Sequence, residues 1–447
     1  MASTRRSSRR LSAVLTLVLA LTATFGLAGP AGVAELAHAE ESFKPPKPDH
    51  IVIVVMENKD RSSIIGSAKA PYINSLAKQG ANMMQSYGVT HPSQPNYVAM
   101  FFGDQHGVTS NKCTMLDQDN LGTQLIDNGL TFTGYAESLP SVGSTACSAD
   151  GGKYERKHVP WASSTKLPDS ANQPFSAFPT DFTQLPTVAI VAPNMCSDMH
   201  DCSVRTGDNW VEKNLDDYAQ WAKTHNSLLV LTFDENAGGT VNQIATLIVG
   251  ESVRPGLYAE PMNHYNLLRT IEDAHGLPPL GNAATAASLA TIWNDSPLPV
   301  DDLADGVING GFENGLGGWA TSGTTALVED SHNGFLAVAA GSKTGSRGDS
   351  IVSQTLVVPT GLSKLTVWWR GECADRVSQA YSTIVLKNNS TGKLTTVLPK
   401  TCSTATEWQR VTVPVSDDRS YTLRVVNHDD GARTTGSITY VDDITLS

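Results

Sequence analysis

The 447-residue sequence has few charged side chains, and basic ones are the scarcer kind. Charged residues make up 17% of the chain, and 32 Lys and Arg stand against 44 Asp and Glu, a formal net charge of −12. Because nucleic-acid binders concentrate Lys and Arg, this composition argues against a nucleic-acid partner. An anionic ligand would have to be bound by a few residues at one site. The 40% share of apolar residues excludes a wholly disordered chain.

Long hydrophobic runs are lacking except near the N-terminus. There, four arginines precede an apolar run over residues 11–27, and Ala37-His38-Ala39 fits a signal-peptide cleavage site. A membrane anchor is the alternative, but the run contains Ser and Thr and breaks at Gly29-Pro30. We predict that residues 1–39 are a cleaved signal peptide, with cleavage after Ala31 or Ala34 as the alternatives. The mature chain is then secreted and extracellular, with no transmembrane segment.

Cysteine is also scarce, with six in the chain. None of the spacings matches a zinc finger, and an even number in an exported protein is typical of disulfides. We therefore expect no cysteine nucleophile. Six cysteines allow 15 connectivities, and proximity in the sequence favours the pairs Cys113–Cys147, Cys196–Cys202 and Cys373–Cys402.

The first half of the chain alternates predicted strands with predicted helices. Continuous apolar runs predict strands over residues 50–56, 187–191, 227–233 and 244–249. Helical spacing of apolar residues predicts helices over residues 71–80, 210–225 and 265–275. This alternation is typical of an α/β sandwich with a mostly parallel sheet, and we assign it to a domain over residues 46–296.

The pattern changes after the Pro- and Asp-rich segment 294–299. Short β-type runs separated by Gly, Ser, Asn and Asp follow, and neither a helix nor an internal repeat is expected among them. We predict an all-β sandwich domain over residues 304–447. Its expected strands cover residues 351–358, 365–369, 383–386, 411–415, 421–426 and 438–446.

Acidic residues directly follow two of the predicted strands. Glu57-Asn58 follows the strand over 50–56, and Asp234-Glu235 follows the strand over 227–233. In an open α/β sheet, ligands bind beyond the carboxyl ends of the strands, so both pairs are expected at one edge. Carboxylates crowded at one edge repel each other, and a hard divalent cation is the common remedy. The alternative for each pair is an ordinary solvated loop acid.

A third candidate, Ser93, lies between these pairs in the sequence. It stands where a helix is expected to begin, with Pro95 in the first turn. A hydroxyl at that position faces free backbone N–H groups and the positive end of a helix dipole, which favours both an alkoxide and a phosphate group. The alternative is an ordinary Ser N-cap.

Together, these residues resemble the phosphoesterase family, which includes bacterial non-haemolytic phospholipases C and secreted acid phosphatases. The matching strings occur in the family's order at residues 54–58, 90–97, 157–161, 193–194, 198–201 and 232–235. They span residues 46–294, about one domain. The Ser-Gln-Pro-Asn string at 93–96 is more similar to the acid phosphatases than to the phospholipases. The resemblance implies an alkaline-phosphatase-like α/β/α sandwich.

The resemblance also implies roles for individual residues. A divalent metal ion of unknown identity would be held by Glu57, Asn58, Asp234 and Glu235, with Ser93 as a further ligand and as the nucleophile. Asn96, His91 and His264 would contact the substrate, and His158 and His200 would act as donors or as the leaving-group acid. The implied reaction is hydrolysis of a phosphate monoester, either a small molecule or a phosphoinositide headgroup, through a phosphoserine intermediate.

The C-terminal part resembles the jelly-roll carbohydrate-binding modules. The strings that carry this are residues 309–313 with Gly318-Trp319 at its start and residues 440–444 at its end. The resemblance implies a polysaccharide ligand and a structural Ca²⁺ at Glu313 and Asp442. Alternation along residues 365–369 puts Trp368 on the face opposite Val367 and Trp369, so one indole is free to stack on a sugar unless both are packing residues.

Two other functions stay open at this point. A phospholipase C or another phosphodiesterase on the same scaffold would need a wider pocket for a second ester group. A non-catalytic surface or carbohydrate-binding protein would keep the fold without turnover, and the intact acids, Ser93 and Asn96 argue against it.

Overall fold

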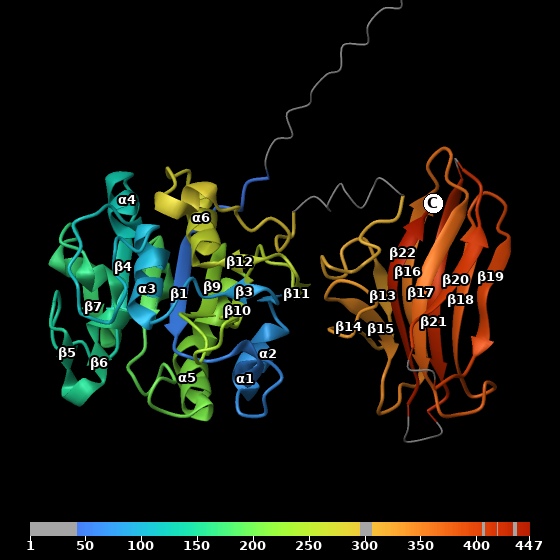
Figure 1. Ribbon diagram of the computed structural model, residues 1–447, viewed down its shortest axis with the longest axis horizontal. Coiled ribbons are helices and arrows are strands. Elements are labelled where there is room, and N and C mark those ends of the chain that lie inside the picture. Colours follow the sequence, from blue (N-terminus) through green and yellow to red (C-terminus); the bar gives the residue numbers. More distant parts are fainter. Residues whose placement is uncertain (1–42, 296–305, 405–406, 418, 432–435) are drawn as a thin grey trace, which may run out of the picture. The chain divides into compact units, whose positions relative to one another are not determined.

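The computed structural model describes residues 43–295, 306–404, 407–417, 419–431 and 436–447 (Figure 1). The predicted signal peptide, residues 1–39, lies outside them, as does most of the Pro- and Asp-rich junction. An α/β part and an all-β part follow one another along the chain.

The α/β part is built on an eight-stranded sheet in the order β11-β2-β10-β9-β1-β8-β4-β7. The strands are β1 (His50–Met56), β2 (Ala81–Met83), β4 (Phe132–Ala136), β7 (Asn172–Pro174), β8 (Val188–Ala192), β9 (Ser227–Phe233), β10 (Thr246–Gly250) and β11 (Gly256–Tyr258). β1 pairs in parallel with β8 and β9, whereas β10 runs antiparallel to both β9 and β2. The sheet is therefore mostly parallel, as predicted.

Helices cover both faces of this sheet. Alternate residues of β1 enter two separate cores, with Ile51 and Ile53 in one and Val52 and Val54 in the other. The first core is shared with α3 (Ser93–Phe102), α4 (Leu121–Asp127) and α6 (His264–His275), and the second with α1 (Arg61–Ile64), α2 (Pro71–Ala77) and α5 (Val204–Ala222). Burial on both faces explains the continuous apolar strands and confirms the three-layer α/β/α architecture.

Helix boundaries depend on capping residues as well as on apolar spacing. α5 begins at Val204, ahead of the predicted start at Trp210, because the Ser203 side chain accepts a hydrogen bond from the Thr206 N–H and caps the helix. α6 begins at His264 and ends before Gly276, whose φ of 68° is the left-handed conformation that glycine adopts readily.

Shorter elements complete this part. Two small sheets pair β3 (Ser86–Tyr87) with β12 (Met262–Asn263) and β5 (Ser148–Ala149) with β6 (Tyr154–Glu155). Short 3-10 turns cover Asp150–Gly152, Arg156–His158, Pro160–Ser163, Asp169–Ala171, Phe175–Ala177, Phe182–Gln184 and Gly281–Thr285.

The C-terminal part consists of two five-stranded antiparallel sheets. One has the order β13-β16-β21-β18-β19 and the other β14-β15-β22-β17-β20. The strands are β13 (Ala320–Ser322), β14 (Thr325–Val328), β15 (Ala337–Gly341), β16 (Gly348–Val357), β17 (Lys364–Glu372), β18 (Ala380–Asn388), β19 (Leu394–Thr401), β20 (Gln409–Pro414), β21 (Ser420–Asp429) and β22 (Ile438–Leu446). Inward residues of both sheets form one core, so the predicted all-β sandwich is confirmed.

The cysteines pair as their order in the sequence suggested. Disulfides join Cys113 to Cys147, Cys196 to Cys202 and Cys373 to Cys402, with Cα–Cα distances of 5.7, 4.7 and 5.1 Å. In the described part of the chain, no helix is both long enough and apolar enough to span a membrane.

Candidate active site

The two acidic pairs meet at one edge of the sheet, where β1 and β9 end. The Asp234 N–H donates to the Met56 carbonyl at 3.0 Å, and the Asn58 N–H donates to Asp234 Oδ1 at 3.1 Å. Glu57 and Asp234 have no exposed surface, and Glu235 is also buried. These acids are therefore not solvated loop residues.

Ser93 lies between the two acidic pairs. It is the first residue of α3 and is buried, and its hydroxyl oxygen is 3.2 Å from Glu57 Oε2 and 3.2 Å from Glu235 Oε1. The N-cap of α3 is Pro92, with no side-chain capping bond, so Ser93 is not an ordinary N-cap. A hydroxyl carries one proton, so Ser93 can donate to only one of the two carboxylates at a time.

His158 is buried between two carboxylates. Its Nε2 is 3.1 Å from Glu57 Oε1, and its Nδ1 is 3.3 Å from Asp198 Oδ2. His158 Nε2 and Asp198 Oδ2 have no aligned hydrogen bond in the described part of the chain, so both are close contacts without a hydrogen bond at these atoms. Burial lowers the pKa of His158 well below its usual value, and Lys157 and His200 lower it further.

Tyr97 supports both His158 and Glu57. Its hydroxyl donates to Glu57 Oε1 at 2.7 Å, and its ring stacks on His158 with centroids 5.3 Å apart. One oxygen of Glu57 thus faces Tyr97 and His158, while the other faces Ser93. Tyr97 therefore fixes the rotation of the Glu57 carboxylate group.

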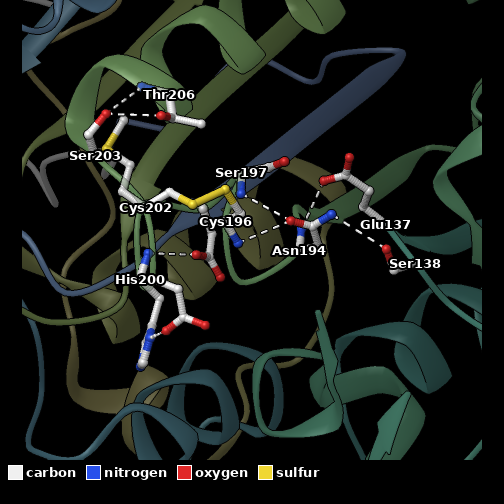
Figure 2. Close-up of a disulfide and its surroundings, with 12 residues drawn as sticks. Glu137, Ser138, Asn194, Cys196, Ser197, His200, Cys202, Ser203 and Thr206 are labelled. Atoms are coloured by element: carbon white, nitrogen blue, oxygen red, sulfur yellow. Dashed lines mark hydrogen bonds and ion pairs between the residues drawn. A yellow bond between two sulfur atoms is a disulfide. The ribbon is translucent and has the colours of Figure 1, made fainter. Parts of the chain in front are cut away.

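His200 lies on the loop between Cys196 and Cys202 (Figure 2). Its ring centroid is 5.8 Å from that of His158, and its side chain keeps 28% of its surface exposed. The His200 N–H donates to Asp198 Oδ1 at 2.7 Å, and its Nδ1 is 2.7 Å from Asp201 Oδ1. Unlike His158, His200 is thus open to solvent beside the buried acids.

The other three side chains that were predicted to contact the substrate make hydrogen bonds within the protein. Asn96 Nδ2 donates to the Thr90 carbonyl at 2.8 Å and reaches Glu235 Oε2 at 3.3 Å. His91 Nδ1 lies 2.7 Å from Glu235 Oε2, and His264 Nε2 lies 2.6 Å from the Asp234 carbonyl. Burial lowers the pKa of His264 to about 4. All three support the Asp234-Glu235 pair, and their contact with substrate stays a prediction.

The carboxylates at this edge are short of positive partners. Burial, followed by repulsion from Asp234 and Asp198, raises the pKa of Glu57 well above its usual value. Burial and then Glu235 raise the pKa of Asp234 to about 7, and burial raises the pKa of Glu235. Asp234 Oδ2 is buried without a hydrogen-bond partner in the described part of the chain. A cation among these oxygens would relieve both the repulsion and the missing contact.

The donor set has the chemistry of a site for a hard divalent cation. All five predicted ligands, Glu57, Asn58, Ser93, Asp234 and Glu235, offer oxygen atoms. Within the described ranges, however, no three His, Cys, Asp or Glu side chains converge as a preformed metal site. Instead, Ser93 bridges two of the carboxylates, and Asn58 Nδ2 donates to Glu57 Oε2 at 3.0 Å. The residues therefore fit an ion by their chemistry, and metal binding itself stays a proposal.

Sequence reasoning gave no role to three residues beside this site. Tyr97 is four residues after Ser93, so helical spacing could have placed it on the same face of α3. Asp198 lies within one of the matching strings, but its contact with His158 depends on a loop conformation. Lys59 Nζ donates to the Met199 carbonyl at 2.8 Å and to the Asn58 carbonyl at 3.2 Å, contacts that carry no sequence signal.

In the all-β part, Glu313 and Asp442 both bind backbone N–H groups of one segment. Glu313 Oε1 accepts from Phe335 and Leu336 at 2.8 and 3.0 Å, and Asp442 Oδ2 accepts from His332 and Asn333 at 2.8 and 3.2 Å. Both carboxylates therefore fix the segment 332–336, and a Ca²⁺ ion there stays a prediction.

The two neighbouring indoles of β17 have different surroundings, as alternation predicted. Trp369 is 3% exposed in the sandwich core, whereas Trp368 is only partly buried and lies outside that core. The ring of His332 stacks on Trp368 with centroids 3.7 Å apart. One indole is thus a packing residue, and the other lies on the outer face of its sheet.

Comparison with known proteins identifies the class of this chain. The Phosphoesterase family matches residues 67–278. Phosphatidylinositol-3-phosphatase of Mycobacterium tuberculosis is 51% identical over 250 residues, which cover 55% of this chain and 83% of that protein. The chain belongs to the phosphoesterase family. The prediction of a phosphoric monoester hydrolase is confirmed by this relative and by the acid phosphatases among the others.

More distant relatives and solved structures resemble parts of the chain. The phosphate-repressible acid phosphatase of Penicillium chrysogenum is 29% identical over 268 residues, covering 55% of this chain and 64% of that protein. A crystal structure in the alkaline phosphatase superfamily from Vibrio parahaemolyticus covers 69% of this chain and 78% of its own, with 12% identity and a TM-score of 0.42. TmCBM61, solved with beta-1,4-galactotriose, covers 31% of this chain and 94% of its own, with 21% identity and a TM-score of 0.25.

Proposed function

We propose that this protein is a secreted, metal-dependent acid phosphatase that hydrolyses phosphate monoesters through a phosphoserine on Ser93. The observation that carries the proposal is the buried Ser93 hydroxyl, 3.2 Å from both Glu57 and Glu235 at the start of α3. The 51% identity to a phosphatidylinositol-3-phosphatase supports phosphatidylinositol 3-phosphate as one substrate.

The proposed reaction has two displacements at phosphorus. Ser93 Oγ forms a bond to phosphorus while the bond to the ester oxygen breaks, and the Ser93 proton leaves to water. Because His200 is partly exposed beside the buried acids, it is suited to protonate the leaving alcohol. Water then cleaves the phosphoserine, which releases phosphate and restores the Ser93 hydroxyl.

Glu57, Asn58, Ser93, Asp234 and Glu235 would hold the divalent ion. When bound, the ion would offset the negative charge on the phosphoryl group and stabilise the Ser93 alkoxide. The chain's own contribution is to hold these oxygens together in a dry site: Tyr97 fixes Glu57, and His91 and His264 fix the Asp234-Glu235 pair. The positive end of α3 adds a fixed field that favours phosphate.

Two observations support secretion. The three disulfides are typical of an oxidising compartment. The predicted signal peptide agrees with them, although it lies outside the described residues. Mass spectrometry of the N-terminus of protein recovered from culture medium would test both the cleavage and the site at Ala39.

The proposed activity is tested by assaying the chain from residue 40 to residue 447 on p-nitrophenyl phosphate and on bis(p-nitrophenyl) phosphate. We expect turnover of the monoester at acidic pH, loss of turnover with a chelator and recovery when a divalent metal is returned. Faster turnover of the bis-ester would favour the phosphodiesterase alternative. No turnover of either ester under any metal would favour the non-catalytic alternative.

We also propose that the outer face of β17 binds a polysaccharide. Trp368 lies outside the core with the His332 ring stacked on it and the Arg410 guanidinium 5.8 Å from its centroid, so a sugar would displace one of these side chains to reach the indole face. The Trp408 ring centroid is 6.0 Å from that of His332. Aromatic faces of this kind bind the apolar faces of sugar rings. The test is affinity electrophoresis of the full chain in soluble β-1,4-galactan and in xylan, comparing Trp368→Ala with Tyr381→Ala on the other sheet. Loss of retardation only in Trp368→Ala supports the proposal. If neither polysaccharide retards the wild-type protein, the proposal is contradicted for these sugars.

A further inference from the structure

A disulfide between Cys196 and Cys202 closes a short loop that carries His200 of the candidate active site (Figure 2). We propose that this loop is a positioning device for protonation of the leaving group, in which the disulfide and Met199 together hold Asp198 and His200 beside His158. The inference rests on the proposed phosphatase function and adds to it a structural cause for the placement of the proton donor.

Ties at several different atoms fix the loop. The Cys196–Cys202 bond brings residues six apart in the sequence to a Cα–Cα distance of 4.7 Å. The Glu57 N–H donates to the Asp198 carbonyl at 2.9 Å, which joins the loop to the end of β1. Lys59 Nζ donates to the Met199 carbonyl at 2.8 Å. The loop is therefore held from its two ends and from its middle.

Met199 anchors the middle of the loop. Its backbone φ is 78°, which is uncommon for a residue other than glycine, and its side chain is completely buried in the core between the sheet and α5. Gly207 of α5 makes room for it, because a Cβ atom at Gly207 would collide with Met199 Cγ. Such a backbone conformation persists only where the surroundings fix it, and residues of this kind gather at functional sites.

With Met199 turned into the core, its two neighbours contact the candidate active site. Asp198 Oδ2 is 3.3 Å from His158 Nδ1, and Asp198 Oδ1 accepts from the His200 N–H at 2.7 Å. The Asp198 carboxylate therefore contacts the ring of His158 and the backbone N–H of His200. The His200 ring itself is held by Asp201 of the same loop, and the two ring centroids are 5.8 Å apart. Asp198 is a positioning residue in this arrangement, and the loop determines where it lies.

The inference predicts a dependence on the leaving group. An alkyl phosphate releases an alkoxide that needs a proton, whereas p-nitrophenyl phosphate releases a stabilised phenolate that needs little help. General acid catalysis contributes about 10²–10⁴-fold when the donor is well placed. A loosened loop should therefore slow hydrolysis of glycerol phosphate far more than hydrolysis of p-nitrophenyl phosphate. Damage to the whole site would slow both by the same factor.

The test compares kcat/KM for these two esters in full-length variants. For the double variant Cys196→Ser with Cys202→Ser, we expect roughly a tenfold or greater fall on glycerol phosphate and a much smaller fall on p-nitrophenyl phosphate. The matched control, Cys373→Ser with Cys402→Ser, removes a disulfide of the all-β part and should leave the ratio of the two rates unchanged.

A second variant tests the inference if the double variant Cys196→Ser with Cys202→Ser does not fold. Lys59→Gln keeps the disulfide but removes the tie to the Met199 carbonyl, and it should shift the same ratio in the same direction. Equal losses on the two esters, or no loss, in the variants that fold would overturn the inference. A wild-type protein that hydrolyses neither ester would instead overturn the proposed function.

Discussion

Buried carboxylates occur in both parts of the molecule, but their partners differ. Burial raises the pKa of Asp234 in the α/β part to about 7, and it raises the pKa of Asp442 in the all-β part to about 7 as well. Asp234 Oδ2, however, has no hydrogen-bond partner among the described residues, whereas Asp442 Oδ2 accepts two backbone N–H groups. A raised pKa therefore does not by itself distinguish a functional acid from a structural one; these two acids differ in that Asp234 keeps a buried oxygen without a partner at the candidate active site.

We expect the largest effect from removing the Ser93 hydroxyl, which lies between Glu57 and Glu235 in the α/β part. Ser93→Ala removes the proposed nucleophile and one hydrogen bond while keeping the helix start. We expect kcat to fall roughly a thousandfold or more, with an unchanged circular dichroism spectrum and melting temperature. Steady-state rates on p-nitrophenyl phosphate measure this. Near-normal kcat in a folded Ser93→Ala protein would show that the nucleophile lies elsewhere, with Thr90 next to test.

A smaller loss of rate, reversible by metal, is expected from neutralising the acids themselves. Glu57→Gln and Asp234→Asn keep the shape of each side chain and remove one negative charge, so they should weaken metal binding and lower the rate. Because binding follows mass action, a higher metal concentration should restore part of the activity. Bound metal is measured by mass spectrometry beside the rate.

If Glu57 and Asp234 are not metal ligands, the two variants should give different results. Lost kcat with unaltered metal affinity would indicate a general base instead of a ligand. Unchanged metal content in both variants would remove Glu57 and Asp234 from the proposed ligand set.

Much of this site could be predicted because its acids continue directly from buried strands. The apolar runs of β1 and β9 are unambiguous, and a parallel pair of strands brings the residues after them to one edge. Ser93 could be placed at a helix start from Pro95 and the apolar run that follows. In each case the evidence is local in sequence.

The remaining features depend on contacts between distant residues. β4 was missed because Gly134 interrupts its pattern, yet that glycine is needed where the Trp161 ring packs against the strand. β15 was missed because both faces are buried and its alanines show no alternation. The role of Asp198 depends on the left-handed backbone at Met199, which no sequence pattern indicates.

The structural acid of the all-β part should affect stability and not rate. Asp442→Ala leaves the N–H groups of His332 and Asn333 without their acceptor, at a cost of about 1–3 kcal/mol. We expect a lower melting temperature with unchanged kcat on p-nitrophenyl phosphate. The matched control is Asp417→Ala, an exposed acid whose Oδ2 accepts only a long bond of 3.4 Å from the Gly361 N–H, and it should change both quantities much less. A fall in kcat for Asp442→Ala would contradict the division drawn between the two kinds of acid.

We expect the smallest effect from the titration of Glu272, a buried acid that should be protonated in the folded protein. Burial raises the pKa of Glu272 in α6 to about 8, and its Oε2 and Gln124 Oε1 are both buried without partners in the described part of the chain. Between the ordinary Glu pKa near 4.3 and about 8, the folded protein holds a proton that the unfolded chain has released. Stability therefore falls as the pH rises through this window.

The variant Glu272→Gln removes this titration and can keep the hydrogen bond from the Leu280 N–H. Asp234 and Asp442, whose pKa values are also raised to about 7, lower the stability of both proteins over the same pH range. From pH 6 to pH 7 we therefore expect the free energy of unfolding to fall by more in the wild type than in the variant, with a difference of about 1.4 kcal/mol at most. Urea unfolding at the two pH values measures it, and equal pH dependence in both proteins would show that Glu272 is ionised in the folded state.

The Cys196–Cys202 disulfide also affects how the enzyme can be manufactured. Its loop carries residues of the candidate active site, so a host whose cytoplasm keeps thiols reduced would yield chains that are soluble but poorly active. Export to the bacterial periplasm, or refolding with a disulfide isomerase, should raise specific activity without raising the amount of protein. Thiol titration of each preparation would then predict its specific activity, which makes oxidation the step to optimise in production.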